Sequence, residues 1–168
     1  MFKKLVLIFK DFYKSINLSE FIELVFIPLF MVVVLFLLIN DSLKMDFIKE
    51  FNGDILTISS LLVAFGLSSI TLLFSTSNNN IEKAKEFITS RVNNSGFNIN
   101  YFQLIQIRAY YAVLCELVLI ILTLISKLLL IKYNLYFMFY VNIFLLIHIL
   151  FVLSLSIINM YHLSWKDR

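Results

Sequence analysis

The sequence has little of what small soluble or secreted proteins depend on. It holds three glycines, one proline and one cysteine in 168 residues, and charged residues make up only 15%. The lone Cys115 excludes an intrachain disulfide and a paired-cysteine zinc or redox site, and its apolar surroundings predict a small buried side chain. Motifs for zinc proteases, serine hydrolases, phosphate loops and dinucleotide binding are all missing. We therefore expect no enzyme, no cofactor and no metal site.

Instead, the chain has long apolar segments. Hydrophobic residues make up 61% of it, eighteen residues are phenylalanine, and the mean hydropathy is +0.91. The charges fall in blocks between long uncharged runs, which is typical of membrane spans and not of a water-soluble bundle. We predict an all-α fold, a four-helix transmembrane bundle in a single domain over 1–168. The expected spans are about 23–39, 55–75, 109–126 and 135–161.

Two segments outside the spans have helical patterns of their own. Residues 2–16 place apolar side chains on one side and lysines on the other, which predicts an amphipathic interfacial helix. That helix either lies on anionic headgroups or packs against the protein's own spans. Asn17 followed by Glu20 resembles a helix start. Residues 78–108 predict a short cytoplasmic helical segment between spans two and three, with an apolar stripe from Ile81 to Val92.

The basic residues indicate the orientation. The segments assigned to the outer side keep four of the fourteen lysines and arginines, Lys44, Lys49, Lys127 and Lys132. Cytoplasmic segments of membrane proteins are enriched in Lys and Arg. We therefore expect a multi-pass protein of the cell membrane with both termini in the cytoplasm.

The second span carries a stripe of small and hydroxylated residues at helical spacing. Its members are Thr57, Ser60, Ala64, Ser68, Thr71 and Ser75. Small residues let membrane helices approach closely, and hydroxyls bond across such contacts or back to their own helix. Alternatively, copies of this helix from several subunits surround a water-filled path, and the stripe lines the pore. Both interpretations stay open.

Two polar residues fall inside later spans. Glu116 lies about 10 Å into the third span by helical rise, and intramembrane carboxylates face a cavity or a partner. Ser154 and Asn159 of the fourth span lie near the same level. His148 lies deeper, so a direct pair with Glu116 is not expected. Glu116 is either a neutral acid bonded to polar neighbours or a functional group, and His148 is best explained as a packing residue.

Basic residues at the cytoplasmic side offer one more candidate site. Lys83, Lys85, Arg91 and Arg108 are positioned to line a vestibule for an anionic nucleotide or oligonucleotide, although the general bias of bases toward the cytoplasm also explains them. Glu82 and Glu86 partly cancel this charge.

Four spans with short cytoplasmic elements leave almost no soluble domain. We expect lipid as a partner, self-association, and function as an oligomeric channel or pore. The alternative is a non-conducting accessory, anchor or immunity subunit that docks a cytoplasmic protein. The span plan resembles membrane subunits of bacterial anti-phage operons such as the Kiwa and Hailong systems. That resemblance implies a membrane effector or sensor controlled by a cytoplasmic partner or nucleotide signal.

Overall fold

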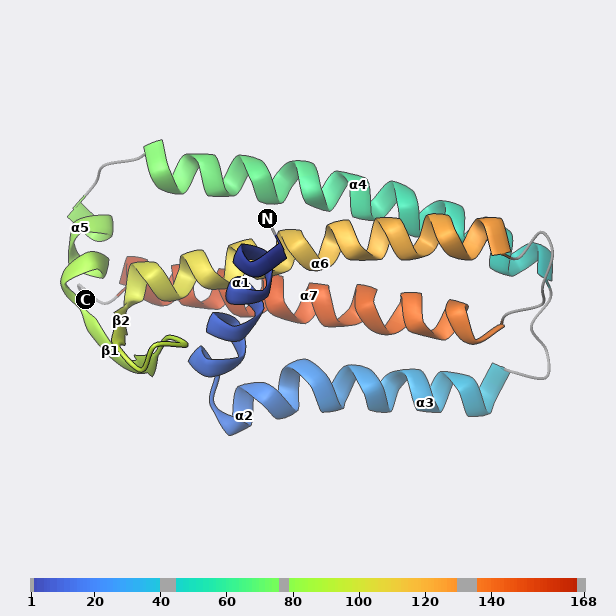
Figure 1. Cartoon of the computed structure of the whole chain (residues 1–168), viewed down its shortest axis with the longest axis horizontal. Helices are drawn as coiled ribbons and strands as arrows, with labels where there is room; N and C mark the ends of the chain where they lie inside the picture. The colour runs from blue at the N-terminus through green and yellow to red at the C-terminus, as the bar shows by residue number, and fades with distance from the viewer. Residues whose placement is uncertain (1, 40–44, 76–78, 130–135, 166–168) are drawn as a thin grey trace.

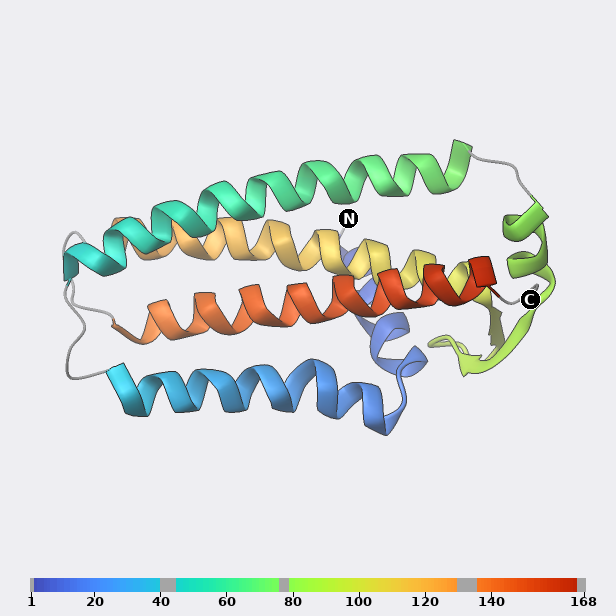
Figure 2. The same cartoon turned by 180° about the vertical axis from the view of Figure 1, so that it is seen from behind.

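Four long helices run side by side along the molecule (Figures 1 and 2). The computed structural model describes residues 2–39, 45–75, 79–129 and 136–165. The bundle consists of α3 (Ile27–Ile39), α4 (Met45–Ser75), α6 (Tyr101–Leu129) and α7 (Tyr136–Trp165). Helix α6 packs along both α4 and α7, and α3 packs on α7. The predicted all-α four-helix bundle is confirmed.

Each of the four helical spans is long and apolar enough to cross a membrane. The qualifying segments are Leu18–Ile39, Met45–Leu72, Tyr101–Leu129 and Tyr136–Asn159. The second begins before the predicted residue 55, because Ile48 and Asn52 continue the buried face of Ile55 through the charged turns. Large apolar side chains on the outside, such as Leu37, Leu38 and Phe137, are more than two-thirds exposed. Such a surface fits a lipid environment, and the protein is a multi-pass membrane protein.

The N-terminal segment packs against the bundle. It consists of α1 (Phe2–Ser15), α2 (Leu18–Phe21) and η1 (Ile22–Phe26), a short π-helix that leads into α3. Asn17 and Glu20 form the expected capping box, in which each side chain bonds the other's backbone N–H. Phe12 of α1 is fully buried and stacks on Tyr111 of α6, with ring centroids 3.6 Å apart. The apolar face of α1 therefore packs on the protein's own span, although Val6 and Leu7 stay about half exposed.

The segment between α4 and α6 is only partly helical. Helix α5 (Asn79–Glu86) is followed by an antiparallel hairpin of β1 (Ile88–Val92) and β2 (Asn98–Asn100). The prediction of a helix as far as Val92 is wrong beyond Glu86. The β-branched residues of β1 favour a strand, and Gly96 turns the chain with a φ of 81°, a conformation that suits glycine. Figure 1 shows α5 and this hairpin at one end of the bundle, the hairpin end, and the opposite end is called the loop end.

The interior consists of two apolar clusters. The larger joins α1, η1, α4, α6 and α7, and includes Cys115, which is buried as expected. The smaller, around Ile48 and Phe139, lies toward the loop end. Several residues used in the predictions lie outside the described ranges: Lys44, Lys132, Lys166, Arg168 and the first positions of two segments, 78 and 135.

Candidate functional site

The stripe of α4 faces away from the other helices. All six of its members are exposed: Thr57, Ser60, Ala64, Ser68, Thr71 and Ser75. The buried residues of α4, including Ile48, Ile55, Ser59 and Gly66, lie on the opposite side of the helix. The structure therefore places the predicted pore-lining residues on one continuous outer face, and no described part of the chain covers this face.

The hydroxyls of the stripe bond to their own helix. Each donates to a backbone carbonyl one turn earlier, at 2.7 to 3.3 Å: Thr57 to Gly53, Ser60 to Leu56, Ser68 to Ala64, Thr71 to Leu67 and Ser75 to Leu72. A hydroxyl that donates in this way is less costly to place in lipid, and its oxygen still accepts hydrogen bonds. The stripe is thus chemically suited to meet either water or another helix.

Glu116 is fully buried and has no hydrogen-bond partner. Neither oxygen of its carboxylate is bonded within the part of the chain that the structure describes. The oxygen Oε2 lies against α4, 3.5 Å from the position a Cβ would take on Gly66. The expected neighbours bond elsewhere, because Ser154 donates to the Leu150 carbonyl and Asn159 accepts from the Tyr101 hydroxyl. Within the described residues, no polar group satisfies Glu116.

His148 is a well-satisfied packing residue. Its Nδ1 lies 2.6 Å from the Leu24 carbonyl oxygen, and its Nε2 lies 2.8 Å from the Tyr111 hydroxyl. A carbonyl can only accept, so Nδ1 donates to it, and in the neutral ring Nε2 accepts from Tyr111. Tyr111 in turn bonds the Tyr13 hydroxyl of α1 at 3.1 Å. The imidazole therefore ties α7 to η1, α6 and α1, and it makes no pair with Glu116.

Pro28 explains why the Leu24 carbonyl is open to His148. In an α-helix that carbonyl would accept the backbone N–H four residues later, but this residue is Pro28, which has no N–H. The preceding turn is a π-helix in which Ile27 donates to Ile22. In membranes the carbonyl freed by a proline is satisfied by neighbouring helices, and here the imidazole of α7 takes that place.

The four basic candidates do not form one open anion site. Arg108 is buried, with a side chain 1% exposed, and its Nη2 lies 2.9 Å from Oε1 of Glu20. Arg91 of β1 lies 3.0 Å from the same oxygen. Lys85 lies over the Phe102 ring. Arg108 therefore does not line a vestibule as predicted, because a carboxylate from the start of the first span draws it inside.

The shared carboxylate belongs to a larger contact at the hairpin end. Asp11 of α1 accepts the backbone N–H of Asn94 at 2.8 Å, while Glu20 holds Arg91. The hairpin is thus tied to the N-terminal segment by two carboxylates. Sequence reasoning used Glu20 only as a cap. The available signal was that Arg108 precedes an apolar span, where a buried guanidinium needs an acidic partner.

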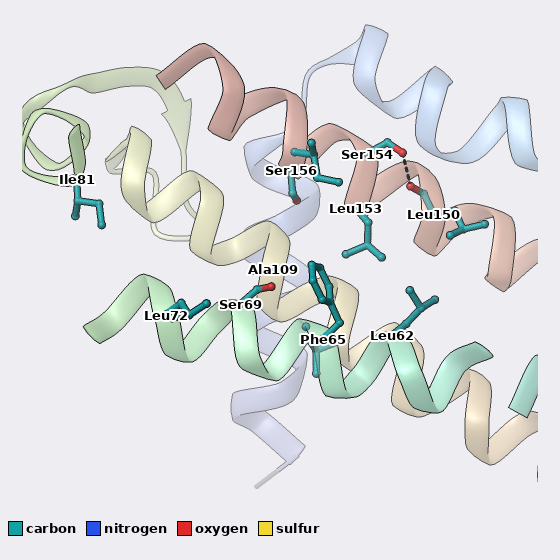
Figure 3. A pocket seen from close by; sticks show the side chains of 13 residues that line it. Leu62, Phe65, Ser69, Leu72, Ile81, Ala109, Leu150, Leu153, Ser154 and Ser156 are labelled. Atoms are coloured by element: carbon teal, nitrogen blue, oxygen red, sulfur yellow. Dashed lines mark hydrogen bonds between the residues drawn. The ribbon is translucent and has the colours of Figure 1, made fainter. Parts of the chain in front are cut away.

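An apolar groove of about 530 Å³ opens between α4, α6 and α7 toward the hairpin end (Figure 3). Leu62, Phe65 and Gly66 of α4 form one wall, and Ala109 and Val113 of α6 lie beneath it. Its polar groups are three hydroxyls, those of Ser69, Ser154 and Ser156. The groove is suited to apolar chains such as acyl tails and not to hydrated ions.

Comparison with known proteins suggests no function for this chain. No protein-family model, no curated protein and no solved structure matches this chain.

Proposed function

We propose that the protein is an oligomeric membrane channel in which the α4 stripes of several copies face a shared path. The observation that carries the proposal is the exposure of all six stripe residues on the face opposite the packed side of α4. Leu61, Phe65 and Leu72 beside the stripe are more than 60% exposed. In an oligomer these flanks pack against neighbouring copies or lipid, and the narrow hydroxylated band lines the path.

The contact at the hairpin end is the proposed place of control. The hairpin is joined to α1 and α2 through Asp11 and Glu20, and to α6 through the carboxylate that Arg91 shares with Arg108. A cytoplasmic protein or an anionic nucleotide that competes for Arg91 would loosen this contact. A change there would reach α6, which packs along α4.

We also propose how the protein is oriented in the membrane and in which kind of cell it acts. The hairpin end and both termini are on the cytoplasmic side of a bacterial cell membrane, and the loop end faces out, which follows the distribution of lysine and arginine. A role as an anti-phage effector or sensor rests on the four-span plan alone.

The second candidate is a non-conducting accessory subunit. The bonding of every stripe hydroxyl to its own helix favours it, because such a band offers small side chains for close packing with a partner span. The cytoplasmic contact would then dock a partner protein without ion flow.

Flux and assembly measured together separate the two functions. The full-length protein is reconstituted in salt-loaded liposomes for ion flux, and its oligomer size is measured in detergent. For a channel, we expect Ser60→Leu and Ser68→Leu to abolish flux and to leave the oligomer intact. Leu61→Phe, which adds bulk to an exposed residue beside the stripe, is the matched control and should conduct.

The opposite results are equally informative. Unchanged flux in both leucine variants would show that this face does not line the path. Weaker assembly in the same variants, detected by crosslinking, would support the accessory subunit, as would a wild-type monomer or dimer without flux.

A further inference from the structure

A row of buried polar side chains runs inside the bundle between α4, α6 and α7. It starts near the loop end, where Asn142 Nδ2 of α7 donates to Asn52 Oδ1 of α4 at 3.3 Å and lies 3.2 Å from Ser126 Oγ of α6. All three residues are completely buried. Each lies within two turns of the end of its helix, so the row begins near the loop end of the bundle.

The row continues from there toward the middle of the bundle. Ser59 lies two turns beyond Asn52 on α4, and Thr123 and Glu116 follow Ser126 along α6 in the same direction, because the two helices are antiparallel. These three side chains are also fully buried. Glu116 Oε2 lies next to Gly66, so these two residues are at about the same level along α6 and α4. Ser59 lies on α4 between the levels of Asn52 and Gly66. From Ser126 to Glu116 the helical rise is about 15 Å.

The members of this row lack partners for many of their atoms. Unbonded within the described residues are Asn52 Nδ2, Ser59 Oγ, Asn142 Oδ1 and both oxygens of Glu116. Nearly all buried polar groups in proteins are hydrogen-bonded, and internal water is a common partner where protein atoms are missing. Each unpaired buried group destabilises the fold, and a carboxylate does so more than a neutral group. Five such atoms along one interface therefore point to water between the helices.

We propose that Glu116 is a proton-binding site that water reaches from the loop end along this row. The carboxylate takes a proton from hydronium in the water line and returns it to water, so only an O–H bond forms and breaks. The polar row is Asn52, Asn142, Ser126, Thr123, Ser59 and Glu116. At the far side of Glu116 the close contact of Gly66 with Val113 separates it from the apolar groove.

Other titratable groups near this path do not neutralise Glu116. From Ile55 to Ser75, α4 has none. Tyr111 on α6 and His148 on α7 bond each other, and the lysines of α1 are exposed. Cys115, the neighbour of Glu116 on α6, packs into the larger apolar cluster and carries no positive charge. A proton is therefore the simplest counter-charge for this carboxylate.

Infrared spectroscopy of the full-length protein in liposomes tests the site directly. The C=O stretch of a protonated carboxyl is assigned to Glu116 by its loss in Glu116→Gln. We expect this band to grow with acidification and to shift within minutes of transfer into D₂O. The proposal is overturned if Glu116→Gln removes no such band at any pH at which the protein stays folded. It is equally overturned if the band stays unshifted in D₂O for hours.

A second measurement tests the path and does not depend on Glu116. In a Cys115→Ala background, Ser59→Cys is compared with Ile55→Cys, a fully buried position one turn away on the same helix. A small water-soluble thiosulfonate should modify Ser59→Cys at least tenfold faster. Equal rates, or no reaction at Ser59→Cys, would exclude the water line. Neither measurement needs flux or an oligomer, so the proton site and the proposed channel stand or fall separately.

Discussion

At the residue scale, the three glycines have different roles. Gly66 lies where α4 crosses α6, and a Cβ there would come within 2.6 Å of Val113 Cγ2. Gly53 of the same helix has only the mobile end of Lys127 nearby, with Nζ 3.9 Å from such a Cβ. Glycine at 66 is thus required by the side chain of Val113, which lies where a larger residue would place its Cβ. At 53 the chain has room for a side chain.

This difference gives a paired prediction. We expect Gly66→Ala to destabilise the fold by about 1–3 kcal/mol, as overpacking of a close contact does, despite the better helix propensity of alanine. Gly53→Ala should be neutral or stabilising by up to about 1 kcal/mol. The thermal unfolding midpoint in detergent measures both. Adding Val113→Ala should restore much of the loss in Gly66→Ala, and equal midpoints for the two glycine variants would contradict the contact.

At the scale of elements, Glu20 joins three parts of the fold. It caps α2, holds Arg91 of β1 and supplies the only charge that pairs with buried Arg108 of α6 among the described ion pairs. Arg108 Nε and Nη1 have no hydrogen-bond partner among the residues that the structure describes, so the stability of this guanidinium inside the protein depends on the one carboxylate. Removing one member of a buried ion pair leaves an uncompensated charge.

We therefore expect Glu20→Gln to cost about 3 kcal/mol or more. Glutamine still completes a capping box, so the loss reports the charge and not the cap. Glu23→Gln is the control, because Glu23 is exposed and only accepts a bond from Ser19. Hydrogen exchange of the backbone amides in β1 and β2 should also be faster in Glu20→Gln and unchanged in Glu23→Gln. Similar unfolding midpoints for both variants would show that Arg108 does not need its partner.

The elements also show which parts of the fold could be predicted from the sequence. The number of spans could be predicted because long uncharged runs are typical of segments in lipid. The spacing of Asn17 and Glu20 predicted a helix cap, and the structure contains it. The hairpin was missed because Ile81, Ala84, Ile88 and Val92 recur at helical spacing, and this pattern continues from α5 through the residues that form β1. The stripe was found, but its direction was not, since a period of 3.6 does not say which face of a helix is packed. The Glu20 contact joins residues 88 positions apart, which no local pattern reveals.

At the scale of the whole molecule, the polar structure outside the spans gathers at one end. Helix α5, the hairpin and the contact with α1 and α2 lie at the hairpin end (Figures 1 and 2). At the loop end, the described structure consists of the ends of the four long helices, at Ile39, Met45, Leu129 and Tyr136. The two faces of the membrane thus meet very different surfaces of the protein.

Labelling of single cysteines tests which face is which. In a Cys115→Ala background, we expect Ser95→Cys in the exposed hairpin turn to react with a membrane-impermeant maleimide only after the cell membrane is opened. Leu128→Cys lies in the last turn of α6 and is 69% exposed. It should react while the cell membrane is still closed, once the outer membrane of the bacterium has been made permeable to the reagent. The reverse pattern would place both termini outside.

The short connections at the loop end also bear on how the protein is made. With the hairpin end in the cytoplasm, as proposed, synthesis has to move across the bilayer only two short stretches of chain, around residues 40–44 and 130–135, with the adjoining ends of the helices. Their basic residues are Lys44, Lys49, Lys127 and Lys132. The polar groups of α5, the hairpin and α1 never leave the side on which the ribosome releases them. Such a chain is suited to insertion as two helical hairpins, α3 with α4 and then α6 with α7. The contact through Glu20 closes after the second of them is in place.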